Sequence, residues 1–274
     1  MRRIPKGPEL LVALDIDGTL VAEGSFHVPQ ATREAVADVV AAGYRVVLAS
    51  GRSLVGILPV ATVLGLHGAW LVASNGAVTA RMDRTMPCGY RVESCQVLDV
   101  APVVRLARRL CPGVRVAVEE VGWGYRVSTP FGTDELNGRQ TVVGPEDLVE
   151  APTPRVVLAG RAAASRLLGP VRSLGCTANP ANPDWVDVTP EGVSKATALD
   201  AVRRHLGIDE TATVAIGDGV NDLQMLAWAA RSFAMGHASP VVQEAAGAVT
   251  GTLAENGAAT VLRSLLAAPV VVGA

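Results

Sequence analysis

The segment Leu11–Leu20, with the sequence LVALDIDGTL, most constrains the fold of this 274-residue chain. Its first four residues are apolar, which is typical of a strand buried on both faces in the middle of a parallel sheet. Asp15 and Asp17 follow, and Gly18 permits a sharp turn. Open α/β sheets bind ligands beyond the carboxyl ends of their strands. The segment is therefore interpreted either as part of a ligand site or as an ordinary Asp-Gly turn.

Three further apolar segments end in glycine and small polar residues. They are residues 45–49, which precede Ser50 and Gly51, residues 69–73, which precede Asn75, and residues 213–216, which precede Gly217–Asp222. Helical patterns over residues 29–42 and from 51 to about 64 separate the first three strands, and Pro59 is expected to kink or restart the second helix. This alternation predicts parallel βαβ units with right-handed crossovers. The polar strand ends should then converge on one crevice.

Residues 84–184 have a different pattern, with short alternating strands at 114–118, 125–128 and 155–159. Helical segments are expected at about 100–110 and 162–174, and the Asn-Pro-Ala-Asn-Pro run at 179–183 predicts a turn. The predicted fold class is therefore α/β. A Rossmann-like, doubly wound parallel sheet would be formed by residues 1–83 and 185–274, and residues 84–184 would form a smaller inserted α/β cap domain.

After residue 185 the first pattern returns. Ser194 is a candidate N-cap for a helix that begins at Lys195 and runs to about residue 206. A short strand is expected at 232–235, followed by helices at about 239–245 and 255–266. Lysine occurs only at Lys6 and Lys195, and the other 22 of the 24 basic residues are arginine. Lys195 is therefore an unusual choice of cation within this chain.

Composition argues against several classes of function. The formal net charge of −2 gives no general attraction to nucleic acid or to an anionic membrane, and neither partner is expected. No run of 18 apolar residues predicts a membrane span. The basic residues Arg2, Arg3 and Lys6 precede an apolar run that Asp15 interrupts, so a signal peptide is not predicted. The four cysteines form no CxxC pair, which favours reduced thiols and a cytoplasmic location.

The acidic residues at the predicted sheet edge indicate a specific chemistry. Asp15, Asp17, Asp218 and Asp222 would repel one another unless a cation neutralised them. Mg²⁺ does so with oxygen ligands, commonly one or two carboxylates and a substrate phosphate. Ser50 and Gly51 offer a hydroxyl and backbone N–H groups at a helix start, and Lys195 offers a positive charge. Together these groups describe a site for a small phosphorylated substrate.

Each of these residues also has an ordinary interpretation. Asp222 could complement a helix dipole, Ser50 could be an N-cap, and Lys195 could be a solvated surface residue. The four histidines lack metal-ligand spacing and are expected to be structural or surface residues; they are His27, His67, His205 and His237. The aromatic residues Trp123, Tyr125 and Trp185 could face a substrate or pack in a core. One shared site explains the whole set of acidic and basic residues more simply than chance placement of each residue does.

The ordered motifs resemble those of the haloacid dehalogenase (HAD) superfamily of phosphatases. The first motif, DxDGT, matches residues 15–19, and the second matches Ser50 in Ala-Ser-Gly-Arg. The third matches Lys195 in Gly-Val-Ser-Lys, and the fourth, GDxxND, matches residues 217–222. The insertion of roughly 100 residues between the second and third motifs, and Asn75 after the third strand, resemble the Cof-type subgroup with its large C2B-like α/β cap.

This resemblance implies a role for each matched residue. Asp15 would be the nucleophile that forms an aspartyl-phosphate. Asp17 would be the acid and base, and its backbone carbonyl would join Asp15 and Asp218 in binding Mg²⁺. Ser50, Gly51 and Lys195 would bind the phosphoryl group. Asn221 and Asp222 would support this arrangement, and Asn75 is a possible substrate contact.

The resemblance leaves other functions open. A phosphomutase of the phosphomannomutase type carries the same motifs, but it needs a second anion site on the cap, for which Arg115, Arg126 and Arg139 are scattered candidates. A non-catalytic binding protein on the same fold would tolerate the loss of Asp15 or Asp17, yet both are present. The leading hypothesis is an Mg²⁺-dependent phosphatase acting on a small phosphorylated metabolite.

Overall fold

A computed structural model describes residues 10–132 and 134–267 of the chain. The predictions made for Arg2, Arg3 and Lys6 lie outside these residues. Within the described part of the chain, no helix combines the length and the apolar character that crossing a bilayer requires. All four cysteines are free thiols.

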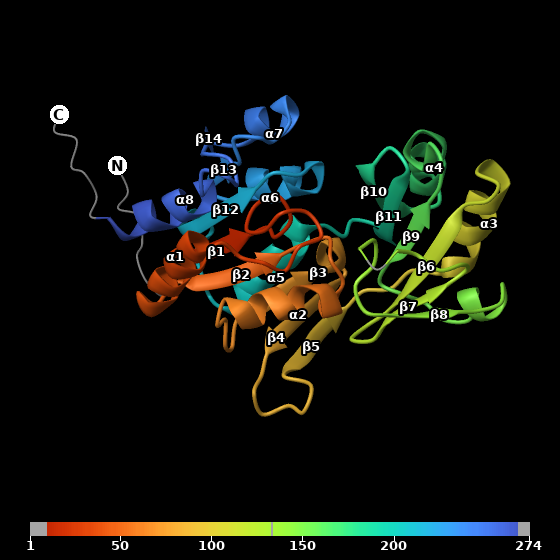
Figure 1. The fold of residues 1–274 in the computed structure, drawn as a ribbon, viewed down its shortest axis with the longest axis horizontal. Helices are drawn as coiled ribbons and strands as arrows, with labels where there is room; N and C mark the ends of the chain where they lie inside the picture. Colours follow the sequence, from red (N-terminus) through yellow and green to blue (C-terminus); the bar gives the residue numbers. More distant parts are fainter. Residues whose placement is uncertain (1–9, 133, 268–274) are drawn as a thin grey trace.

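The larger of two sheets has the strand order β14-β13-β12-β1-β2-β3-β4-β5 among the described residues (Figure 1). Its strands are β1 (Leu11–Leu14), β2 (Arg45–Ala49), β3 (Trp70–Ala73), β4 (Val78–Met82), β5 (Tyr90–Cys95), β12 (Thr213–Gly217), β13 (Arg231–Ala234) and β14 (Ala248–Val249). Strands β1 to β3 and β12 to β14 are parallel, and β4 and β5 extend the sheet as antiparallel strands. Every residue of β1 and of β3 is buried, as expected for apolar strands covered on both faces.

Strand order reverses between β1 and β12. From β1 the chain proceeds to β2 and β3 on one side, and from β12 it proceeds to β13 and β14 on the other. Such a switch point opens a crevice at the carboxyl ends of the two central strands. Asp15 follows β1 and Asp218 follows β12, so the topology alone brings these two carboxylates together.

Helices cover both faces of the larger sheet. They are α1 (Gln30–Ala41), α2 (Leu54–Val63), α5 (Lys195–His205), α6 (Leu223–Trp228), α7 (Pro240–Ala245) and α8 (Gly257–Leu266). Helix α1 packs against α8, and α5 packs against α6 and β3. Ser194 caps α5 as predicted: its Oγ accepts from Thr197 N at 3.1 Å, and Thr197 Oγ1 accepts from Ser194 N at 2.9 Å. This reciprocal capping box fixes where the helix begins, and hence the position of Lys195.

The smaller sheet has the order β10-β11-β9-β6-β7-β8. Its strands are β6 (Arg115–Glu120), β7 (Gly124–Val127), β8 (Arg139–Val142), β9 (Val156–Ala159), β10 (Cys176–Asn182) and β11 (Trp185–Pro190). Helices α3 (Val100–Leu110) and α4 (Ala163–Arg172) pack together on its outer face, away from the larger sheet (Figure 1). Alternate residues of β6 and β9, such as Val118 and Val156, form a core with these helices.

The predicted α/β class and parallel central sheet are confirmed, and the strands and helices expected in residues 29–73 and 195–266 are present. Two local predictions differ from the structure. Helix α2 continues through Pro59. Residues 179–182 form the end of β10, where a register shift accommodates Pro180, so the predicted turn is wrong there. Strand β8 has no counterpart among the predictions, because its four residues have little apolar character.

The two sheets divide the chain differently from the predicted bounds of 83/84 and 184/185. Residues 90–95 form an edge strand of the larger sheet and residues 185–190 belong to the smaller one. Strand β5 is almost wholly exposed, so its sequence lacks the apolar pattern of the central strands. Strand β11 has buried valines at 186 and 188, and these imitate the core pattern. The separation into a core and a cap domain stays a prediction.

The three aromatic residues of uncertain environment also take defined places. Tyr125 is buried and belongs to a small apolar cluster against which Trp185 packs. Trp123 is 51% exposed.

We predict that Gly76→Ala destabilises the protein more than Gly113→Ala does. Both glycines have a positive φ, 105° and 83°, which disfavours any side chain. At Gly76 an added Cβ would also lie 2.2 Å from the carbonyl oxygen of Ser194, the N-cap of α5, whereas at Gly113 it would meet nothing within 4 Å. Urea unfolding should show a loss of about 1–2 kcal/mol for Gly113→Ala and a clearly larger loss for Gly76→Ala. Equal losses of unfolding free energy would contradict the close packing of Gly76 against Ser194.

Candidate active site

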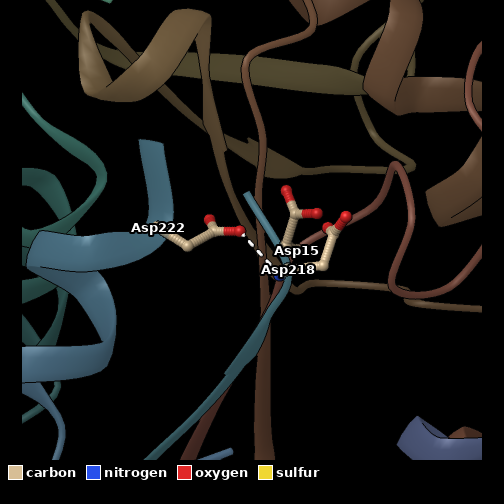
Figure 2. Close-up of side chains that lie close together, drawn as sticks. All are labelled: Asp15, Asp218 and Asp222. Atoms are coloured by element: carbon tan, nitrogen blue, oxygen red, sulfur yellow. Dashed lines mark hydrogen bonds between the residues drawn. The ribbon is translucent and has the colours of Figure 1, made fainter. Parts of the chain in front are cut away.

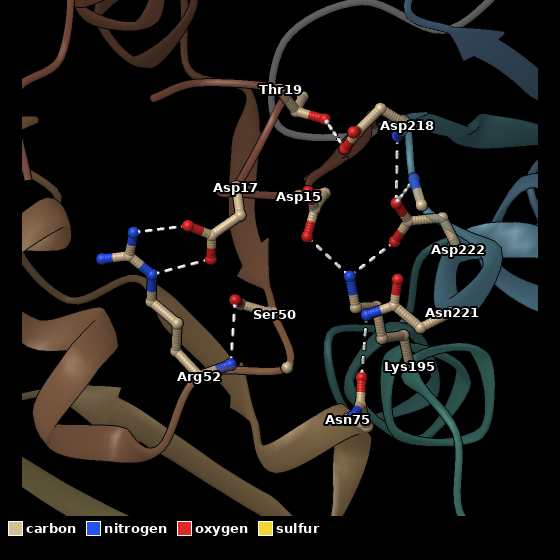
Figure 3. Close-up of polar contacts among 12 residues, drawn as sticks. Asp15, Asp17, Thr19, Ser50, Arg52, Asn75, Lys195, Asp218, Asn221 and Asp222 are labelled. Atoms are coloured by element: carbon tan, nitrogen blue, oxygen red, sulfur yellow. Dashed lines mark hydrogen bonds and ion pairs between the residues drawn. The ribbon is translucent and has the colours of Figure 1, made fainter. Parts of the chain in front are cut away.

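The ammonium group of Lys195 joins two carboxylates at the switch point. Its Nζ donates to Asp15 Oδ1 at 2.6 Å and to Asp222 Oδ1 at 2.5 Å (Figure 3). Lys195 and Asp222 are fully buried and Asp15 is 4% exposed. The three side chains come from the end of β1, the first turn of α5 and the turn after β12, so Lys195 connects three segments that are distant in the sequence.

Asp222 also closes the turn that carries Asp218. Its Oδ2 accepts hydrogen bonds from the backbone N–H groups of Asp218 at 3.0 Å and Gly219 at 2.9 Å. Asp218 in turn accepts from Thr19 Oγ1 at 3.2 Å. Gly18 is required beside it, because a Cβ at that position would lie 2.1 Å from Asp218 Oδ2. The turns after β1 and β12 are therefore packed directly against each other.

Three carboxylates form one cluster at this edge of the sheet. One oxygen each of Asp15, Asp218 and Asp222 lies within 4.8 Å of the others (Figure 2). Burial, together with the charge of Asp222, raises the pKa of Asp15 well above its ordinary value and raises that of Asp218 as well; Lys195 opposes both shifts. The Lys195 pKa is raised by Asp15 and Asp222 against the opposing effect of burial. One ammonium group therefore faces three acids.

This donor set fits a hard divalent cation. Carboxylate oxygens are the ligands that Mg²⁺ prefers, and a cation would relieve the repulsion that raises the pKa of Asp15 and Asp218. Asp15 and Asp218 are the residues that would hold it, since Asp222 is already engaged by Lys195 and two backbone N–H groups.

Asp17 points away from this cluster and toward Arg52. Its two oxygens accept from Arg52 Nε at 2.8 Å and from Nη2 at 2.6 Å (Figure 3). The same guanidinium group donates to the carbonyl oxygen of Ser25 at 2.7 Å and lies 5.0 Å from the centre of the Phe26 ring. The carboxylate of Asp17 is thus outside the group of three acids.

The turn after β2 presents Ser50 to the same crevice. Ser50 Oγ accepts a hydrogen bond from Arg52 N at 3.1 Å, which leaves the hydroxyl proton available for an acceptor. Ser50 is 1% exposed, and α2 begins at Leu54, after this turn. A hydroxyl and the N–H groups of this turn form a surface suited to an anion.

Asn75 and Asn221 form a pair beside Lys195. Asn221 Nδ2 donates to Asn75 Oδ1 at 3.0 Å. Asn75 has a φ of 54° and Ser74 a φ of 52°, an uncommon conformation for residues with side chains. Such backbone strain is often found at functional sites. Asn221 therefore contacts the turn after β3, whereas Lys195 is contacted by Asp222.

The sequence of this chain matches that of a known protein family. Residues 12–91 and 171–262 match the family of haloacid dehalogenase-like hydrolases, which is more than half of the chain. The chain belongs to the haloacid dehalogenase-like hydrolases. The resemblance seen in the four motifs is thus confirmed, as is the expected class of enzyme, a hydrolase. Residues 92–170, between the matched segments, contain α3 and most of the smaller sheet.

Relatives of this HAD-like hydrolase extend over nearly its whole length. "Putative phosphatase YkrA" of Bacillus subtilis (strain 168) is 28% identical over 264 residues, which cover 93% of this chain and 97% of the relative. The structure of BT1666 from Bacteroides thetaiotaomicron, described among phosphatases of the HAD superfamily, is 27% identical with a TM-score of 0.77 and covers 96% of this chain and 98% of its own. The HAD subclass IIB sugar phosphatase BT4131 shares the fold, with a TM-score of 0.79, 24% identity and coverage of 93% and 98%.

Among the described residues, three side chains contact the carboxyl group of Asp17 or Asp218 without having been predicted to do so. They are Arg52, which binds Asp17, Thr19, which binds Asp218, and His237, whose Nε2 lies 3.7 Å from Asp218 Oδ2. Thr19 and Arg52 lie within the quoted motifs, so their positions could have suggested a role. His237 follows β13, the strand next to β12, and the strand-end argument could have found it.

We predict that Lys195→Met strongly destabilises this hydrolase at neutral pH. Removing the ammonium leaves Asp15 and Asp222 buried without a cation, which costs about 3–5 kcal/mol. The loss should shrink as the pH falls, because the pKa of Asp15 is already raised above 3.8 and protonation removes its charge. Urea unfolding at several pH values measures both effects.

The exposed Arg105 of α3 supplies the control, since Arg105→Met removes a positive charge far from these acids. The double variant Lys195→Met/Asp222→Asn should recover part of the lost stability. An unfolding free energy for Lys195→Met equal to that of Arg105→Met would contradict the central role of the buried ammonium.

Proposed function

We propose that this protein is an Mg²⁺-dependent phosphatase that hydrolyses a small phosphomonoester, such as a sugar phosphate, through an aspartyl-phosphate on Asp15. The observation that carries the proposal is the buried contact of Lys195 Nζ with Asp15 and Asp222 beside Asp218. Family membership and relatives named as phosphatases support the same reaction.

In the first step Asp15 attacks phosphorus. Lys195 holds Oδ1 of this carboxylate, so we assign the attack to Oδ2. A new bond forms between this oxygen and phosphorus as the bond from phosphorus to the leaving oxygen breaks. Lys195 and the hydroxyl of Ser50 stabilise the negative charge of the phosphoryl oxygens. Magnesium, when bound, would neutralise carboxylate charge and polarise a phosphoryl oxygen.

Asp17 handles the protons in both steps. It would donate a proton to the leaving oxygen, and in the second step it would accept one from the water that attacks the aspartyl-phosphate. Inorganic phosphate and free Asp15 result. Because both oxygens of Asp17 are bound to Arg52, either transfer requires the Asp17 side chain to leave that pairing. In the proposed reaction, Asp17 is therefore paired with Arg52 in the resting enzyme and is released from Arg52 for each proton transfer.

The alternative phosphomutase function receives less support. Arg115 is paired with both oxygens of Glu135, at 2.8 and 2.6 Å, and Arg126 lies near Glu120 and Glu150. Arg139 stacks on the ring of Trp123 at 4.5 Å. Acidic partners compensate Arg115 and Arg126, so a second anion site on the smaller sheet has no free pair of arginines among these candidates.

We predict that Asp15→Asn abolishes phosphate release from a panel of sugar phosphates and other metabolite phosphates assayed with Mg²⁺. Loss of the nucleophile should lower kcat by at least about 10³-fold, while thermal unfolding shows a folded protein. Asp38→Asn, at an exposed position of α1, is the matched control and should keep full activity. Turnover by a contaminant-free Asp15→Asn preparation would refute the assigned nucleophile. Isomer formation by the wild type without phosphate release would favour the mutase.

We also predict that the reaction depends reversibly on Mg²⁺. EDTA should abolish turnover and excess Mg²⁺ should restore it, whereas EDTA already saturated with Mg²⁺ should have no effect. Asp218→Asn removes one of two assigned carboxylate ligands and should raise the Mg²⁺ concentration needed for half-maximal rate by about tenfold or more, with Asp38→Asn again as control. A rate that is unchanged in excess EDTA contradicts the metal assignment.

A further inference from the structure

One face of the smaller sheet turns charged side chains toward the larger sheet. These side chains are Glu119 of β6, Arg155 directly before β9, and Asp187 of β11. Glu119 N donates to Arg155 O at 3.0 Å, and Val157, two residues after Arg155, pairs with Asp187. Strand alternation therefore puts all three on the same face, opposite to the valines that pack on α3 and α4.

Arg155 is the centre of this charged face. Its Nε donates to Glu119 Oε2 at 3.1 Å, and its Nη1 lies 3.5 Å from Asp187 Oδ2. Nη2 donates to the hydroxyl of Tyr125, and Nη1 also donates to the backbone carbonyl of Gly51 in the larger sheet. The side chain is only 6% exposed. Arg155 thus contacts the crevice through a single backbone carbonyl, that of Gly51.

That carbonyl belongs to the peptide unit between Gly51 and Arg52. The N–H of the same unit donates to Ser50 Oγ at 3.1 Å. The peptide is consequently held at both ends, by Arg155 at its oxygen and by Ser50 at its nitrogen. Its orientation determines where the Ser50 hydroxyl points, because this hydrogen bond fixes the position of Oγ.

The two acids of the charged face hold the neighbouring turn after β3. Ser74 Oγ donates to Glu119 Oε2 at 2.7 Å, and Asn75 Nδ2 donates to Asp187 Oδ2 at 3.3 Å. This turn is joined to the first by two backbone hydrogen bonds, Ser74 N to Arg52 O at 2.7 Å and Asn75 N to Ser50 O at 3.0 Å. The charged face therefore contacts both the turn that contains Ser50 and the turn after β3.

The energetic character of this network favours positioning over stability. Burial raises the pKa of Glu119 although Arg155 opposes the shift, which shows how poorly solvated the carboxylate is. Among the residues that the structure describes, Glu119 Oε1 has no hydrogen-bond partner. Buried ion pairs of this kind seldom stabilise a fold more than apolar residues of the same volume would. Their geometry, in contrast, is directional and fixes the groups that they contact.

We propose that Arg155 is a positioning residue for the phosphate-binding turn at residues 50–52, acting through the carbonyl of Gly51 and assisted by Glu119 and Asp187. This inference rests on the proposed function, because that function assigns phosphate to the turn. It adds a role for the smaller sheet that is independent of the leaving group: the sheet shapes the part of the site that every phosphomonoester shares.

The test compares Arg155→Gln with two controls. Arg172→Gln removes an arginine that binds only the Ala178 carbonyl within the smaller-sheet region, through Nε at 3.2 Å and Nη2 at 2.7 Å. Tyr125→Phe removes one partner of Arg155 but leaves the bond between Arg155 and the Gly51 carbonyl in place. The probe is inorganic phosphate as a competitive inhibitor in the presence of Mg²⁺, since it binds without any leaving group.

Arg155→Gln should raise the inhibition constant of phosphate by about tenfold or more and should lower kcat/KM by one common factor for all substrates. Both controls should stay within about twofold of the wild type. An unchanged inhibition constant overturns the proposal. A loss that differs strongly between substrates also overturns it, because Arg155 would then act on the leaving group. If Arg155→Gln does not fold, Arg155→Lys replaces it, since lysine keeps the charge but lacks the planar fork.

Hydrogen exchange provides a readout that needs no turnover. In the ligand-free protein, Arg155→Gln should speed exchange of the Arg52 amide by about tenfold, and Arg172→Gln should leave it unchanged. Equal exchange in the wild type and Arg155→Gln refutes the positioning role. Failure of the wild type to bind or release phosphate, together with faster exchange in Arg155→Gln, would overturn the proposed function and leave the contact between Arg155 and this turn supported.

Discussion

The arrangement of this protein depends on one buried ammonium group. Lys195 occupies the first position of α5, where the helix dipole is positive and a lysine is unfavourable for the helix itself. It is also fully buried, which disfavours its charge. Both effects are offset only by Asp15 and Asp222, at 2.6 and 2.5 Å. The lysine is therefore placed for the acids at the switch point, and α5 has to begin where the capping box of Ser194 sets it.

The same charges determine how the proposed phosphate and metal sites would depend on each other. Three carboxylates face one ammonium, so the crevice carries excess negative charge and would repel a phosphate dianion. A divalent cation held by Asp15 and Asp218 would cancel this excess charge. In the proposed reaction, metal binding therefore has to come before productive phosphate binding. Asp222 is held by two backbone N–H groups and by Lys195.

Sequence reasoning succeeded where a local pattern determines the structure. Apolar strands followed by glycine and polar residues located β1, β2, β3 and β12 and predicted that Asp15 and Asp218 lie at one edge. The N-cap at Ser194 located the start of α5 at Lys195. Sequence reasoning failed for β5, because an exposed edge strand lacks the apolar signal. It did not predict the pairing of Asp17 with Arg52, because that pairing depends on side-chain orientation rather than on spacing. Glu119 lies in an apolar strand, and alternation with Val118 could have marked its face as a separate environment.

The contact between the two sheets has the chemistry of a site rather than of a core. An apolar contact would hold the sheets together but would tolerate sliding, because dispersion forces have little directionality. Arg155, Glu119 and Asp187 instead make directional contacts with Gly51, Ser74 and Asn75. The turns that receive these contacts are the one that contains Ser50 and the one after β3. A smaller sheet in another position would keep the ion pairs of Arg155 with Glu119 and Asp187 but would lose the hydrogen bonds to Gly51, Ser74 and Asn75. These directional bonds therefore favour the observed docking geometry and with it the observed shape of the turn at residues 50–52, which we propose binds phosphate.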